Sequence, residues 1–306
     1  MTAMLDTAGP FHEGELALQE ATGEREAGVA NGRIIVDRII PNAVPFIARQ
    51  EFAVVATIDG DGQPWCSPLL GPPGSFTAPD LDRVALARMA GRADDPLWRN
   101  VSDDPRVGLL FLEVGSRRRY RVNGSVPDPD ADPLLVEVRE AFPNCPKYIS
   151  RRHLTVGPPR TDAPVAEQGT SLGESEWRIV AAADTVFVAS ANPAGHLDAS
   201  HRGGAPGFVQ RHGERLWVPD YRGNSMFNTL GNLAINPAAG LLFIDFAGGE
   251  ALQLTGTTAI DLADPDDAGR TGGTGRSWTL TPGQWRRAPL PARFRAELLD
   301  LSPFNP

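Results

Sequence analysis

The chain has 306 residues, of which 41% are hydrophobic and 22% charged, and its formal net charge is −9 at pH 7. These values are typical of a soluble globular protein and predict two domains of ordinary size. The acidic balance without a basic stripe argues against nucleic acid as a partner. Two cysteines, Cys66 and Cys145, imply no disulfide framework. No apolar run approaches the roughly 18–20 residues that cross a bilayer, and the first residues carry no signal-peptide pattern, so we expect a cytoplasmic protein without a membrane partner.

The first part of the chain divides into a peripheral segment and a strand-rich segment. Residues 1–40 are expected to be peripheral, with a short amphipathic helix over 14–26. Residues 41–130 are predicted to form the first domain. Its clearest strand is 52–58, a β-branched and aromatic run, and the turn sequence Asp-Gly-Asp-Gly follows it at 59–62.

The middle of the chain, residues 131–170, is predicted to form a helix and a linker. The sequence Leu-Leu-Val-Glu-Val-Arg-Glu-Ala-Phe at 134–142 predicts a helix. A segment containing Asn-Cys-Pro-Lys-Tyr-Ile follows at 144–149, and residues 161–170 have the composition of a linker.

Residues 171–262 are predicted to form the second domain, and residues 263–306 a loop and a tail. A short helix is expected at about 225–235, with Asn224 or Ser225 as its N-cap, and it should end before Asn236-Pro237 because proline disfavours helix in the preceding residue. The tail is expected to pack back on the body through its aromatic residues. The predicted strands of the second domain are 185–191, 214–221, 240–246 and 251–260.

The two predicted domains repeat one another in sequence. Residues 104–111 read Asp-Pro-Arg-Val-Gly-Leu-Leu-Phe, and residues 236–243 read Asn-Pro-Ala-Ala-Gly-Leu-Leu-Phe. Such internal similarity indicates one supersecondary unit used twice. Five or six antiparallel strands and one short helix per unit predict a mainly β (α+β) fold built from small closed barrels. Further identical pairs are Gly62/Gly195, Ser67/Ser200, Gly74/Gly207, Asn100/Asn232, Pro105/Pro237 and Gly124/Gly256.

One stretch resembles a known family. Residues 219–246, preceded by Ser-His-Arg-Gly-Gly-Ala-Pro-Gly-Phe at 200–208, are similar to the pyridoxamine 5′-phosphate oxidase-like family of flavin-binding split barrels. The second repeat carries this resemblance well and the first more weakly, and residues 142–152 also look like a segment of multi-domain members. The resemblance implies two tandem split β-barrels with short helices and FMN as cofactor, with FAD, a deazaflavin or haem as alternatives.

The second repeat also carries the residues expected at a phosphate site. A helix N-terminus favours an anion, and Arg222 lies just before the predicted helix. Arg202 matches the arginine that family members use near the flavin phosphate, whereas Asn228 and Thr229 stand where the family often has a basic residue. The predicted cofactor-binding residues are Ser200, Arg202, Tyr221, Arg222, Asn224, Ser225, Asn228 and Thr229, with Lys147, Tyr148 and Arg151 from the middle segment.

The first repeat lacks most of these polar residues. Leu69 stands opposite Arg202, and Pro96-Leu97 stands opposite Asn228-Thr229. We therefore expect a degenerate first barrel, a single main flavin site in the second, and a monomer with pseudo-dimeric barrels, or else a homodimer.

Three functions stay open at this point. The first is an FMN-dependent oxidoreductase acting on a small molecule, with a nicotinamide as a candidate electron donor. The second is a flavin-binding module without catalysis, serving as a carrier or a redox sensor. The third is a haem-binding split barrel, with His153, His196 or His201 as ligand. No catalytic residue is evident, and the five histidines show no metal-ligand spacing.

Overall fold

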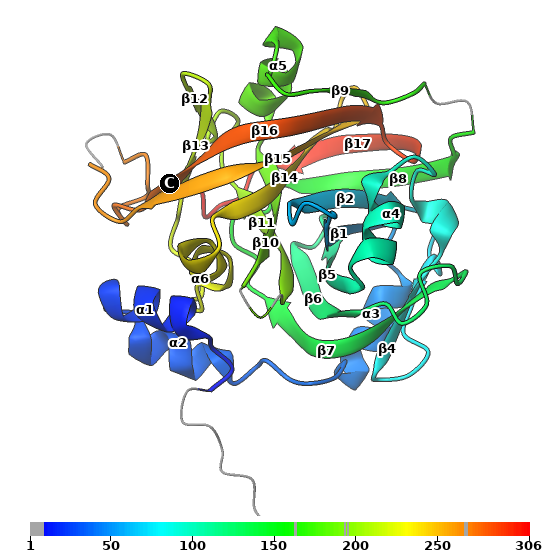
Figure 1. The fold of residues 1–306 in the computed structure, drawn as a ribbon, viewed down its shortest axis with the longest axis horizontal. Coiled ribbons are helices and arrows are strands. Elements are labelled where there is room, and N and C mark those ends of the chain that lie inside the picture. Colours follow the sequence, from blue (N-terminus) through cyan, green and yellow to red (C-terminus); the bar gives the residue numbers. More distant parts are fainter. Residues whose placement is uncertain (1–8, 162–163, 193, 195, 266–268) are drawn as a thin grey trace, which may run out of the picture.

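The computed structural model describes residues 9–161, 164–192, 194, 196–265 and 269–306. Two large antiparallel sheets dominate it, one from each half of the chain (Figure 1). Among the described residues, no helix is both long and apolar enough to cross a membrane.

The first sheet has seven strands in the order β2-β1-β5-β6-β7-β4-β3. Its strands are β1 (Phe52–Ile58), β2 (Pro64–Leu70), β3 (Phe76–Thr77), β4 (Arg83–Leu86), β5 (Arg106–Glu113), β6 (Arg118–Ser125) and β7 (Leu134–Asn144).

The second sheet has the corresponding order, β11-β10-β14-β15-β16-β13-β12, and the short β9 also pairs with β16. Position by position, each of these seven strands takes the place of one strand of the first sheet. The seven strands are β10 (Thr185–Ala191), β11 (Leu197–Gly203), β12 (Gln210–His212), β13 (Arg215–Pro219), β14 (Ala238–Asp245), β15 (Glu250–Asp261) and β16 (Ser277–Pro289), and β9 comprises Glu167–Gly169.

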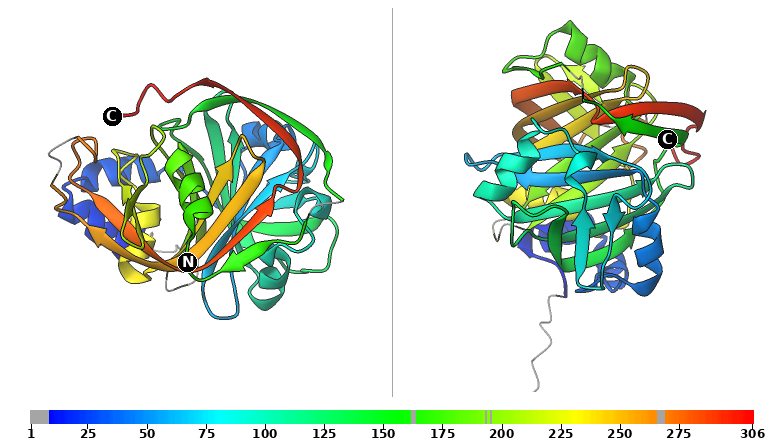
Figure 2. Two further views of the ribbon diagram at one scale, coloured as in Figure 1. Left: turned by 90° about the horizontal axis from the view of Figure 1, so that it is seen from above. Right: turned by 90° about the vertical axis from the view of Figure 1, so that its right-hand side faces the viewer.

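Each half ends in one more strand, and these two strands pair with each other. Strand β8 (Arg151–Pro159) follows the first sheet, β17 (Ala292–Asp300) follows the second, and they run antiparallel. Figure 2 shows β17, in red, lying beside β8, in green. This pairing joins the C-terminal strand of the first half to the C-terminal strand of the second half.

Six short helices of the described residues lie outside the sheets. Helices α4 and α6 hold equivalent places, each directly before the strand that carries the Gly-Leu-Leu-Phe sequence. The helices are α1 (Glu13–Ala21), α2 (Arg25–Gly32), α3 (Val44–Ala48), α4 (Pro96–Asp103), α5 (Glu174–Ala182) and α6 (Asn228–Ile235), with 3₁₀ turns η1 (Pro41–Ala43) and η2 (Arg88–Ala90).

The buried apolar side chains of the described ranges form three main hydrophobic clusters. One fills the first barrel, one fills the second, and the third lies between the two sheets. The third cluster brings Phe52 and Val54 of β1 together with Phe187 and Ala189 of β10, all at most 4% exposed. The two barrels therefore share a buried apolar interface and pack as one body.

The repeated Gly-Leu-Leu-Phe sequence has a structural cause at this interface. A Cβ added to Gly108 would lie 2.8 Å from the backbone nitrogen of Ala199, and one added to Gly240 would lie 2.5 Å from the carbonyl oxygen of Pro64. Real Cβ atoms do not approach so closely. The two glycines thus let the backbone of each barrel approach the other, in reciprocal fashion.

Several predicted elements agree with the structure. The predicted strands 52–58 and 185–191 are β1 and β10, and the other predicted strands of the second domain correspond to β13, β14 and β15. The tail packs on the body as expected, with Trp278 fully buried.

Other predictions were wrong. Residues 134–142 form strand β7, not a helix, because they pair with β6 and β4. The first sheet therefore runs to Asn144, beyond the predicted boundary at residue 130, and the second runs through β16, in what was predicted to be loop and tail. Residues 162–163 of the predicted linker and 266–268 of the predicted loop lie outside the described residues.

The N-terminal segment and the second-domain helix also differ from prediction. Residues 13–32 form the two helices α1 and α2, and α1 packs against α6 instead of standing at the periphery. Helix α6 begins only at Asn228, and its N-cap is Phe227, not Asn224 or Ser225. It ends at Ile235, before Asn236-Pro237 as predicted.

Candidate functional site

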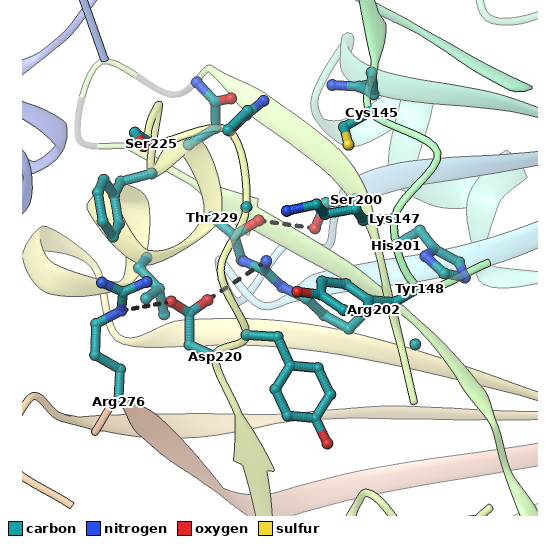
Figure 3. A pocket seen from close by; sticks show the side chains of 18 of the residues that line it. Cys145, Lys147, Tyr148, Ser200, His201, Arg202, Asp220, Ser225, Thr229 and Arg276 are labelled. Carbon is teal, nitrogen blue, oxygen red and sulfur yellow. Dashed lines mark hydrogen bonds and ion pairs between the residues drawn. The ribbon is translucent and has the colours of Figure 1, made fainter. Parts of the chain in front are cut away.

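A pocket lies where the two barrels meet, and Figure 3 shows it from close by. The first half contributes β6 and residues 144–148, and the second contributes β11, residues 219–230 and Arg276. The cavity has a volume of about 90 Å³, enough for a few water-sized groups. Both halves of the chain are thus needed to form it.

Four arginines gather in this pocket. Arg119 and Arg121 alternate along β6 and so share one face of that strand, while Arg202 comes from β11 and Arg276 directly precedes β16. Burial, and then the positive charges of Arg121 and Arg202, lower the pKa of Arg119 to about 9. The guanidinium remains charged at neutral pH, and an anion in the pocket would relieve the repulsion.

Two of these arginines keep unused donors. The Nε atoms of Arg121 and Arg202 are buried and make no hydrogen bond to any described residue. A buried N–H group without an acceptor is costly, and native structures rarely keep one. These donors indicate that the pocket is built for an acceptor that the protein itself does not supply.

The N-terminus of α6 opens into the same pocket. Its N-cap, Phe227, has a left-handed backbone conformation (φ 60°) and makes no side-chain capping bond. The hydroxyl groups of Thr229, in the first turn, and Ser200, on β11, lie 2.8 Å apart (Figure 3). Uncapped helix N–H groups and the helix dipole attract anions. The helix and the arginines therefore favour the same kind of ligand.

Carboxylates compensate only part of the positive charge. Asp220 lies between two arginines, 3.5 Å from Arg202 Nη1 and 2.9 Å from Arg276 Nε (Figure 3). Glu24 also pairs with Arg276, at 2.6 Å. Arg119, in contrast, donates to the carbonyl oxygens of Cys145 and His201. Of these four arginines, only Arg119 forms no ion pair with a carboxylate in the described part of the chain.

Behind the pocket, Arg121 reaches a buried acid. Its Nη1 atom lies 2.8 Å from Asp198 Oδ1 and donates to the side-chain oxygen of Asn228 at 3.3 Å. Burial raises the pKa of Asp198, whereas the charge of Arg121 opposes that rise. This pair fixes the guanidinium of Arg121 while leaving its Nε free.

Two tyrosines stand together among the other lining residues. The rings of Tyr148 and Tyr221 are 5.1 Å apart, and Tyr148 donates its hydroxyl to the carbonyl oxygen of Arg222 at 2.9 Å. Tyr148 has a positive φ of 68°, which is uncommon for a bulky residue. Its position therefore depends on contacts between the two halves of the chain.

The structure brings most of the predicted residues together. Arg222 contributes only its carbonyl oxygen, which accepts from Tyr148 and Lys147, and it does not line the pocket. Arg151 lies elsewhere, where its Nε donates to Asp300 at 2.8 Å. The predicted residues that line the pocket are Lys147, Tyr148, Ser200, Arg202, Tyr221, Asn224, Ser225, Asn228 and Thr229.

Sequence reasoning missed the arginines of the first barrel. The run Arg117-Arg118-Arg119-Tyr120-Arg121 places Arg119 and Arg121 two residues apart, which is the spacing that puts side chains on one face of a strand. That signal was available, but the first repeat was interpreted as degenerate. Glu24 and Arg276 lie in segments predicted as periphery and loop, where no local pattern identifies a site.

In the first barrel, the N-terminus of α4, which is equivalent to that of α6, is capped by a carboxyl group of the protein. Asp95, the N-cap of α4, accepts from the N–H of Leu97 at 3.0 Å and from the hydroxyl of Ser67 at 2.5 Å. Arg286 approaches the same carboxylate at 3.8 Å, and Gln253 donates to it at 3.4 Å. The first barrel thus supplies its own anion at the helix N-terminus that the second barrel leaves open.

The three candidate haem ligands lie in different places. His201 lines the pocket, is 4% exposed, and has no hydrogen-bond partner among the described residues at either ring nitrogen. Burial, followed by the charges of Arg119 and Arg202, holds its pKa well below the usual range. His153 lies on β8 and His196 beside Arg139, both outside the pocket lining. Among described residues, no group of three or more His, Cys, Asp or Glu is arranged to hold a metal.

Residues 39–142 match the family model for pyridoxamine 5′-phosphate oxidase. The match covers the first barrel, which is therefore similar to the split barrels of the pyridoxamine 5′-phosphate oxidase family. The match falls on the first repeat, although the resemblance noted in the sequence is stronger in the second. No curated protein matches the chain.

Three solved structures similar to this chain cover about two fifths of its length. A Clostridium acetobutylicum protein of the pyridoxinephosphate oxidase family, related to general stress protein 26, is 16% identical, with 41% of this chain and 92% of that one covered and a TM-score of 0.30. A FAD-binding protein from Mesorhizobium loti is 12% identical, with 40% and 96% covered and a TM-score of 0.29. The haem storage protein of Vibrio cholerae is 12% identical, with 37% and 93% covered and a TM-score of 0.28.

Proposed function

We propose that this protein binds one flavin nucleotide, FMN, in the pocket between its barrels and uses it in a redox reaction on a small molecule. The observation that carries the proposal is the pair of buried, unpartnered Nε donors on Arg121 and Arg202 beside the uncapped N-terminus of α6. Together they form a site for a compact anion with several oxygen atoms, which describes the phosphate of a flavin mononucleotide.

Different pocket residues would hold the phosphate and the flavin ring of such a cofactor. Arg119, Arg121 and Arg202 would bind the phosphate together with the first N–H groups of α6. The cavity of about 90 Å³ suits the phosphate better than a whole nucleotide. Tyr148 and Tyr221, whose paired rings line the same pocket, would hold the flavin ring through aromatic contacts. The flavin supplies hydride or electron-pair transfer, while the protein orients it and excludes water.

Two features support a single cofactor per chain. The carboxylate of Asp95 occupies the helix N-terminus of the first barrel, so a second phosphate would meet a negative charge there. The pocket already draws its walls from both halves of one chain, which is what a partner subunit would otherwise supply. We therefore propose a pseudo-dimeric monomer with a nicotinamide or another small reductant as its electron donor.

One observation favours a second candidate, a haem site. The imidazole of His201 lines the pocket with both ring nitrogens unpartnered, and its lowered pKa keeps it neutral, which is the form that ligates iron. The four arginines favour the flavin nucleotide, because guanidinium groups bind phosphate oxygens through charge-assisted hydrogen bonds. A flavin that binds but resists reduction by nicotinamides would indicate a carrier or sensor without catalysis.

The test compares FMN with riboflavin, which lacks the phosphate. Both are titrated into the cofactor-free protein, and the change in flavin fluorescence gives each dissociation constant. Charge-assisted hydrogen bonds contribute about 1.5–3 kcal/mol each, so FMN should bind at least about tenfold more tightly. Equal affinity for the two flavins would remove the phosphate site from the proposal.

A further inference from the structure

The loop in front of α6 has a conformation that its own sequence does not favour. This loop, residues 220–227, is called the pocket loop below, and it carries Asp220, Tyr221 and Ser225 of the site. Two of its non-glycine residues, Ser225 (φ 61°) and Phe227 (φ 60°), have left-handed backbone conformations. Such conformations persist only where the surrounding structure holds them, and they concentrate at functional sites.

The N-terminal helical hairpin, residues 13–32, lies against this loop and α6 (Figure 1). Three of its side chains bind three consecutive residues of the pocket loop. Asn31 donates to the carbonyl oxygen of Asn224 at 2.7 Å. Glu24 accepts from the hydroxyl of Ser225 at 2.5 Å, and Gln19 donates to the carbonyl oxygen of Met226 at 3.3 Å.

Backbone contacts support the same attachment. A Cβ on Gly14 would lie 2.2 Å from the carbonyl oxygen of Gly231 in α6, and one on Gly28 would lie 2.8 Å from the carbonyl oxygen of Ser225. Met226 is fully buried beside Phe11, which comes from the segment just before the hairpin. The hairpin therefore contacts the pocket loop and the first turns of α6 closely.

We propose that the N-terminal hairpin is a positioning element for the anion site. By fixing residues 224–226, it holds Phe227 in the left-handed conformation that leaves the N-terminus of α6 uncapped and turned toward Arg121. Glu24 adds a second constraint, because it pairs with Arg276 while holding Ser225. The assignment of FMN as the ligand rests on the proposed function, whereas the positioning of the loop does not.

The test uses the full chain with Gln19→Ala and Asn31→Ala, singly and combined, since neither residue lines the pocket. Glu20→Ala, on the exposed side of α1, is the matched control. Two quantities are measured: amide hydrogen exchange of residues 224–231 in the cofactor-free protein, and the dissociation constant for FMN. Loss of two hydrogen bonds should raise the dissociation constant on the order of tenfold. Exchange in 224–231 should quicken while that in β10 and β14 stays unchanged.

The two readouts separate the failure of each proposal. If amide hydrogen exchange of residues 224–231 is unchanged in the double variant, the positioning role is overturned. This holds whether or not the dissociation constant for FMN changes. Faster exchange in a protein whose wild-type form does not bind FMN would uphold the positioning role and overturn the proposed cofactor. Faster exchange with an unchanged dissociation constant would also overturn the inference, because the loop conformation would then not control the site.

Discussion

Glu15 provides a pH-dependent test of how the hairpin is attached. It lies on α1, only 4% exposed, and accepts from the N–H of His12 at 2.9 Å and from the side chain of Asn228 at 2.5 Å. Burial raises its pKa from 4.5 to about 7, Asp198 and Glu140 add to the rise, and the two hydrogen bonds oppose it. Glu15 is therefore protonated in the folded protein at pH 5 and ionised at pH 8.

The raised pKa converts into a change of stability. A carboxyl group whose pKa is higher in the folded state stabilises that state below its unfolded pKa, near 4.5, and loses this contribution as the pH rises through 7. The difference between 4.5 and about 7 corresponds to about 3 kcal/mol. Glu15→Gln cannot ionise, so it avoids this loss, although it gives up one accepted hydrogen bond worth about 1 kcal/mol.

The assay is urea denaturation of wild type and Glu15→Gln at pH 5 and pH 8, followed by circular dichroism. The variant should be slightly less stable than wild type at pH 5 and more stable at pH 8, with a relative change of about 2.5 kcal/mol between them. Glu20→Gln, exposed on the same helix, should follow wild type at both pH values. A difference between Glu15→Gln and wild type that is the same at pH 5 and pH 8 would show that Glu15 does not titrate between these pH values in the folded protein.

Three further predictions address the site and the interface between the barrels. Arg202→Ala should weaken FMN binding by about 10- to 100-fold, because a charge-assisted hydrogen bond is lost. Fluorescence titration measures this, and an affinity within twofold of wild type would mean that Arg202 does not bind the cofactor. Asp95→Ala should lower the free energy of unfolding by about 1–2 kcal/mol through loss of the α4 cap, while FMN affinity, measured on the same samples, should not change. Gly240→Ala should destabilise the chain by about 1–3 kcal/mol in thermal unfolding, because its Cβ would meet Pro64 in the other barrel, and a neutral effect would mean that the barrels separate easily.

The strands and the repeat pattern were accessible from the sequence because each depends on local signals. β-Branched runs bounded by turn residues predicted β1 and β10 within their bounds. Residues 134–142 were wrongly predicted as a helix because their Glu and Arg residues favour one. Their pairing with β6 and β4 makes them a strand instead. A propensity argument has no access to a strand partner supplied by tertiary structure.

The predicted part of the site is its second-barrel half, together with Lys147 and Tyr148 of the middle segment. Arg202, Asn228 and Thr229 belong to a continuous pattern that a family resemblance can identify. Glu24 and Arg276 enter the pocket from distant segments, and the left-handed conformation of Phe227 is imposed by neighbours rather than by its own residue type. These features depend on how the two barrels and the hairpin come together, which no single stretch of sequence records.

The most direct test of the central claim is the absorbance spectrum of the purified protein, with the released cofactor identified by mass and counted per chain. We expect flavin bands, the mass of FMN, and one equivalent per chain, either as purified or after FMN is added. Two equivalents would contradict the single site between the barrels. A haem spectrum, or a protein that neither contains nor takes up flavin, would contradict the assignment of the pocket to FMN.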